Sequence, residues 1–134
     1  MKIYKIAKLI SIISYLLIIL MGMMIGIPFF IWLLLTLFDF GNADQLFAFF
    51  GVIGLIILFT TFNSIITLKI LLLDIVCFVL LVSPIIRRLT AIPIEQFNYS
   101  FFIIPTTFFL FFYLFSFYFS VKQYFQNQQN INIT

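Results

Sequence analysis

The sequence contains no histidine and only one cysteine, Cys77, among its 134 residues. Zinc clusters, haem held by two imidazoles and internal disulfide bonds each need several of these side chains, so the composition excludes them. Cys77 lies within an apolar run, where a free cysteine behaves as a small hydrophobic residue. We therefore expect no cofactor and no metal site.

Charged residues are also scarce, at 8% of the chain, whereas hydrophobic residues make up 65%. A water-soluble domain has about a quarter charged residues and uses them to cover its core. The net charge of +3 is too small, and its seven basic residues too scattered, for a nucleic-acid surface. The composition predicts an integral membrane protein that has the lipid bilayer as a partner and no nucleic acid as a partner.

The apolar residues fall into four segments that approach the length of a membrane crossing, which takes about 20 helical residues. The first segment, about 9–38, has no charge and exceeds one crossing, so we expect a tilt or a kink at Pro28. The other expected spans are about 46–63, 68–86 and 101–121. The sequence thus predicts an all-α fold, an integral membrane four-helix transmembrane bundle, as one multi-pass domain over residues 1–134.

Polar residues separate these spans. The stretch DFGNADQ at 39–45 is an expected loop, and a turn is expected within FNSIITLK at 62–69. Residues 122–134 are rich in asparagine and glutamine and are expected to form a short mobile polar tail.

The basic residues predict the orientation of the chain. With four spans, both termini share one side of the membrane together with five of the seven basic residues, namely Lys2, Lys5, Lys8, Lys69 and Lys122, against Arg87 and Arg88 on the other side. Positive charge is enriched in cytoplasmic segments. We therefore expect both termini in the cytoplasm, a location in the cytoplasmic (inner) cell membrane, and an uncleaved signal anchor at the first span.

Asp74 is the acid that the sequence places inside the membrane, about five residues or about 7 Å into the third span. A carboxylate facing lipid is costly, so we expect its side chain to face protein or water. Lys69 is five residues away on the same helix, which puts it about 140° around the axis, so the two are not expected to pair.

The preceding span offers hydrogen-bonding partners for Asp74 at a comparable depth. The sequence predicts a polar cluster of Asp74, Asn63 and one or both of Thr60 and Thr61 near the cytoplasmic face. Two roles remain open for this cluster. It either fixes the packing of the second and third spans or handles protons or cations.

Gly22 and Gly26 form a Gly-x-x-x-Gly pattern in the first span. Their missing side chains would allow close approach of another helix, which makes them a candidate helix-packing site and a candidate contact for homodimers. The alternative is a flexible kink together with Pro28.

The residue pattern of known catalytic sites is not found in the sequence, so we expect no enzymatic activity. We interpret the chain as a small multi-pass membrane protein that acts as an accessory or interaction subunit, or as an immunity-type protective protein. Its partner is then another membrane protein or a second copy of itself. The alternative is a small oligomeric transporter or channel that uses the intramembrane Asp74.

Overall fold

The chain is mostly helical. The computed structural model describes residues 2–21 and 25–133, and within them the chain forms five α-helices, one 3-10 helix and two short strands. In chain order these are α1 (Ile3–Leu16), β1 (Ile19–Met21), β2 (Gly26–Pro28), α2 (Phe29–Thr36), α3 (Ala43–Thr61), α4 (Leu68–Ala91), η1 (Ile94–Phe97) and α5 (Ser100–Ile133). The expectation of an all-α fold is confirmed.

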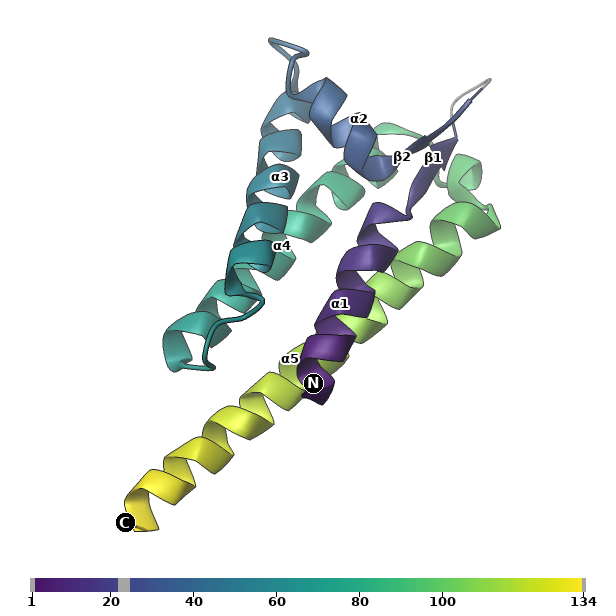
Figure 1. Ribbon diagram of the computed structural model, residues 1–134. Coiled ribbons are helices and arrows are strands. Elements are labelled where there is room, and N and C mark those ends of the chain that lie inside the picture. Colours follow the sequence, from purple (N-terminus) through teal and green to yellow (C-terminus); the bar gives the residue numbers. More distant parts are fainter. Residues whose placement is uncertain (1, 22–24, 134) are drawn as a thin grey trace.

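The long helices form two antiparallel pairs, α1 with α5 and α3 with α4 (Figure 1). Along the first pair, the Ser116 hydroxyl donates to the Tyr4 carbonyl and the Ser11 hydroxyl donates to the Phe109 carbonyl. The start of α1, the turn at 62–67 and the last turns of α5 lie at one end of the molecule, which we call the terminal end. The loop at 37–42 and the segment 92–99 lie at the opposite end.

Three helices in the described part of the chain, α3, α4 and α5, are long and apolar enough to cross a membrane. Helix α1 has 14 residues and rises about 21 Å, which is less than a hydrocarbon core of about 30 Å. Three long apolar helices, and not the four that were expected, are therefore present.

The expected span 9–38 is not one helix, and Pro28 is not a kink within it. Helix α1 ends at Leu16, the two strands pair antiparallel with Ile19 opposite Pro28, and α2 begins at Phe29. The isoleucines here are branched at Cβ and favour extended backbone, and Pro28 has no N–H for a preceding helix. The Tyr99 hydroxyl fixes the hairpin by accepting from the Met21 N–H at 2.8 Å and donating to the Ile19 carbonyl at 2.9 Å.

The predicted helix-packing pair Gly22 and Gly26 lies only partly within the described residues. Gly22 lies outside the described residues, and Gly26 begins strand β2. A Cβ atom at Gly26 would come within 3.1 Å of Ile19 Cγ2 on the paired strand. The missing side chain of Gly26 therefore lets the two strands pack closely. Gly26 does not serve helix packing, because it lies in a strand.

The predicted polar tail 122–134 also differs from the structure. Helix α5 has 34 residues and continues to Ile133, so it is about 51 Å long and extends beyond the start of α1 (Figure 1). The stretch after Lys122 contains no glycine or proline, and glutamine is a good helix former. A helix that has already nucleated in the apolar segment propagates through such residues at little cost.

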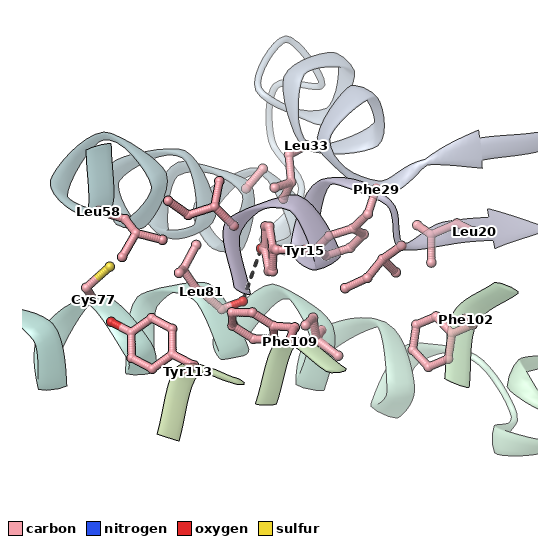
Figure 2. Packing of buried hydrophobic residues seen from close by; sticks show 14 of the residues in the cluster. Tyr15, Leu20, Phe29, Leu33, Leu58, Cys77, Leu81, Phe102, Phe109 and Tyr113 are labelled. Carbon is pink, nitrogen blue, oxygen red and sulfur yellow. Dashed lines mark hydrogen bonds between the residues drawn. The ribbon is translucent and has the colours of Figure 1, made fainter. Parts of the chain in front are cut away.

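The main core lies where α1, α3, α4 and α5 meet. Tyr15 of α1 is fully buried, and its ring packs edge-on against Phe29 and Phe109 with centroids 5.5 and 4.9 Å apart. Its hydroxyl donates to the Leu81 carbonyl of α4 at 3.1 Å, as the dashed line in Figure 2 shows. A single side chain of α1 thus contacts α2, α4 and α5.

Two glycines allow α3 to lie close to its neighbours. A Cβ atom at Gly54 would lie 3.0 Å from Leu81 Cγ, and one at Gly51 would lie 3.1 Å from Pro84 Cγ and from both methyl groups of Leu33. Both glycines are buried and face α4. Close approach of small residues is the usual basis of tight helix packing in membranes.

We predict that Gly54→Leu destabilises the protein by about 1–3 kcal/mol, because the new side chain has no space against Leu81. Unfolding by titration with a denaturing detergent, followed by circular dichroism, measures the change. Ile53→Phe adds bulk at a neighbouring exposed position of α3 and serves as the control. Equal stability of the two variants would contradict the proposed close packing.

Candidate functional site

The interior contains a buried ion pair between α1 and α4. Lys8 Nζ lies 2.8 Å from Asp74 Oδ1, and the two side chains are only 6% and 8% exposed. A buried carboxylate or ammonium group is costly without a partner of opposite charge. The pair satisfies both groups at once and joins residues that are 66 positions apart in the chain.

Helices α3 and α5 also reach this pair. The Lys8 ammonium group donates to Thr61 Oγ1 at 3.3 Å, and Thr61 in turn donates to the Ile57 carbonyl at 2.8 Å. From the other side, the Tyr113 hydroxyl donates to the backbone carbonyl of Asp74 at 2.8 Å. Lys8, Thr61, Asp74 and Tyr113, which we call the ion-pair cluster, therefore connect four helices in one place.

The sequence of α1 explains how a lysine comes to be buried. Its buried face consists of Tyr4, Ala7, Lys8, Ser11, Ile12, Ser14 and Tyr15. These positions recur every three or four residues, which is the spacing of one helix face. Small and hydroxyl-bearing side chains let α1 lie close to α5, and Lys8 points inward with them.

The structure brings together only some members of the cluster predicted around Asp74. Thr61 belongs to it through Lys8, whereas Thr60 is exposed and donates to the Ile57 carbonyl of its own helix. Asn63 is exposed and accepts a hydrogen bond from Lys5 Nζ at 3.3 Å, near the cluster but not in it. The cation that neutralises Asp74 is Lys8, and Lys69 is exposed.

Sequence reasoning missed Lys8 and Tyr113. Lys8 was assigned to the cytoplasmic flank because it precedes the uncharged stretch. The available signal was the polar stripe formed by Lys8, Ser11 and Tyr15 at helical spacing, which marks a face that must be shielded from lipid. Tyr113 gave no signal that distinguished it from the surrounding aromatic residues.

A second ion pair lies near the opposite end of the α3–α4 hairpin. Arg87 Nε is 2.7 Å from Asp44 Oδ1, and these side chains are 35% and 26% exposed. The guanidinium carbon of the neighbouring Arg88 lies 4.8 Å from the ring centre of Trp32 on α2. Both arginines thus attach α4 to elements at that end, although the first pair is partly solvated and contributes little.

Apolar side chains border Asp74 on one side. A cavity of about 130 Å³ next to it is lined by Ile75, Phe78, Tyr113, Leu114 and Phe117. Within the described residues, no group of three metal-ligating side chains comes together. Within the cluster the two charges are paired, and the hydroxyl groups of Thr61 and Tyr113 donate to backbone carbonyls.

Comparison of the chain with models of known protein families, with curated protein sequences and with solved structures found no match. The fold and the ion-pair cluster are therefore described from the residues of this chain alone.

We predict that Asp74→Ala destabilises the protein by about 3–5 kcal/mol, because it leaves the Lys8 ammonium group buried without a counter-charge. The double variant Lys8→Met, Asp74→Leu should recover most of that loss, since apolar side chains of similar volume replace both charges. Chemical unfolding of the purified protein in detergent measures both effects.

Asp44→Ala is the matched control, because it breaks the partly exposed pair with Arg87 and should cost no more than about 1 kcal/mol. An Asp74→Ala variant as stable as Asp44→Ala would show that the buried pair does not hold the helices together. A double variant less stable than Asp74→Ala alone would contradict the charge-neutralisation account.

Proposed function

We propose that the chain is a small multi-pass protein of the cytoplasmic (inner) membrane, without enzymatic activity, that acts as an accessory or interaction subunit or as an immunity-type protective protein. The observation that carries the membrane placement is an apolar outer surface on the long helices around an interior that also holds charged groups. Charged and hydroxyl side chains are buried, among them Lys8, Ser11, Thr61, Asp74, Ser116 and Ser120. A water-soluble protein has the opposite arrangement.

The outer surface of the long helices supports the same placement. Large apolar side chains are exposed along α3, α4 and α5, including Phe49, Ile53, Ile56, Leu72, Val76, Val79, Ile104, Phe108, Phe111 and Leu114. In water, apolar surfaces of this size would make the molecules aggregate. In a membrane, lipid chains cover them and no apolar surface is exposed to water.

The charges at the two ends support an orientation with both termini in the cytoplasm. The terminal end carries Lys2 and Lys5 at the start of α1, Lys69 at the start of α4, and Lys122 where α5 leaves its apolar segment. Arg87 and Arg88 lie near the opposite end, and Lys8 is buried and paired, so the count is four to two. Cytoplasmic segments are enriched in basic residues.

In this arrangement α1 forms the first pass together with the strand hairpin and α2, although it is too short to cross alone. Its contact with α5 and the ion-pair cluster hold it within the bundle. Four passes would place both termini on one side of the membrane, and the start of α1 and the last turns of α5 do lie toward the same end of the molecule (Figure 1).

The ion-pair cluster favours the accessory role over transport. A transport site needs a polar path to its charged residue, whereas Asp74 is closed off by Lys8 and bordered by an apolar cavity. The extension of α5 beyond the start of α1 favours an interaction role, because the described side chains of its last turns are exposed.

We predict opposite labelling of the two ends in intact cells. In a Cys77→Ala background, a membrane-impermeant maleimide should react with Asn98→Cys, whereas Ile65→Cys and Gln126→Cys should react only after permeabilisation. All three positions are exposed, so access depends on the side of the membrane. Labelling of Ile65→Cys and Gln126→Cys on different sides would contradict the orientation.

We also predict that removing residues 126–134 abolishes co-purification of a specific membrane-protein partner in mild detergent while leaving the thermal melting of the bundle unchanged, because Tyr124 and its packing are kept. Sizing and mass spectrometry identify the complex. A symmetric homo-oligomer, together with proton flux in proteoliposomes that Asp74→Asn abolishes, would instead support the transporter.

A further inference from the structure

Two adjoining cavities lie at the terminal end, between the start of α1, the turn at 62–67 and the last turns of α5. The larger has a volume of about 720 Å³, and its lining includes Lys2, Lys122 and the amide side chains of Gln123, Gln126 and Asn127. The smaller has a volume of about 370 Å³ and is lined by Lys5 and the turn residues Asn63 and Ser64. The cavities share Lys2, Tyr4, Gln123 and Asn127, so they form one continuous recess.

The recess is positively charged, and among the residues that the structure describes no acid lines it. Lys2, Lys5 and Lys122 all border it. Asp74 is neutralised by Lys8, and the other acids of the chain, Asp39, Asp44 and Glu95, lie in or beside segments at the opposite end. The lysine charges are therefore not compensated locally, and they attract an anion.

The uncharged groups of the recess fit an anion with several oxygen atoms. Each glutamine or asparagine amide supplies two N–H donors, and each ammonium group supplies three. Lysine and amide side chains from α1, the turn and α5 line the recess, and a phosphate group accepts several charge-assisted hydrogen bonds at once.

One wall of the recess is apolar, since Ile3 and Phe119 line it beside the lysines. Phe119 belongs to the apolar stretch of α5, and Lys122 begins the polar stretch about a turn further along the helix. The recess thus lies where apolar and polar surfaces of the molecule meet. A ligand that has both an anionic group and a hydrocarbon chain matches this combination better than a fully soluble anion.

We propose that this recess binds the phosphate group of an anionic phospholipid from the cytoplasmic leaflet. The inference rests on the membrane placement and orientation proposed above. The lysines and amides hold the headgroup phosphate, and the glycerol backbone and chains follow the apolar wall toward the exposed phenylalanines of α5. Each lysine near such a surface strengthens binding about fivefold.

The test uses the full-length protein in a neutral detergent, with native mass spectrometry to count bound lipid as phosphatidylglycerol or phosphatidylcholine is titrated in. We expect phosphatidylglycerol to be retained in preference to phosphatidylcholine. Lys122→Gln should weaken its binding about fivefold, and the triple variant Lys2→Gln, Lys5→Gln, Lys122→Gln about a hundredfold.

Lys69→Gln is the matched control, because Lys69 is an exposed lysine at the same end that does not line the recess. Its binding should equal that of the unmodified protein, and circular dichroism should show that every variant is folded. An equal loss in Lys69→Gln and Lys122→Gln, or no preference for phosphatidylglycerol, would overturn the proposal.

Competition with glycerol phosphate distinguishes the sources of the phosphate group. Failure of millimolar glycerol phosphate to displace phosphatidylglycerol supports a lipid ligand. Displacement at equal concentration would overturn the assignment to a lipid. A protein that alkaline extraction releases from membranes would refute the membrane placement itself, whereas a membrane-embedded protein without headgroup preference refutes only the lipid site.

Discussion

The buried pair of Lys8 and Asp74 is the constraint on which the arrangement of the helices depends. Neither charge can face lipid, so each must be matched inside the protein, and the two atoms meet at 2.8 Å. Satisfying the pair docks α1 against α4, and Thr61 and Tyr113 extend the same contact to α3 and α5. The most costly groups in the interior are also the ones that specify how four helices come together.

Hydroxyl groups lie in the interior around this pair, and lysines lie at the terminal end. Hydroxyl groups of the interior bond to backbone carbonyls of neighbouring helices, as Ser116 does to Tyr4 and Tyr15 does to Leu81, which ties the helices together without an apolar driving force between them. The surface of the long helices is left to apolar side chains. Uncompensated positive charge gathers at the terminal end, where the proposed lipid phosphate would lie.

Much of the secondary structure follows from local rules, and the exceptions have identifiable physical causes. The apolar runs ending near Thr61 and Ala91 are helices, since their length and composition leave few alternatives. Residues 19–21 and 26–28 are also largely apolar, but they pair as two strands, because strand pairing and the Tyr99 hydroxyl satisfy their backbone groups. Tyr99 is about 80 positions away from Ile19, and a local pattern carries no information about such a contact.

The sequence by itself determined that this chain is helical and apolar enough for a membrane, and that the Asp74 carboxylate must face protein or water. These conclusions follow from composition and periodicity, which are properties of neighbouring residues. The sequence also named Thr61, which the structure brings to the Lys8 side of the ion-pair cluster. Only the tertiary structure decided that Lys8 is the counter-charge, that Asn63 turns instead to Lys5, and that amides of α5 complete a recess with the start of α1. Those outcomes depend on which helix lies beside which, and that is fixed by contacts between residues far apart in the chain.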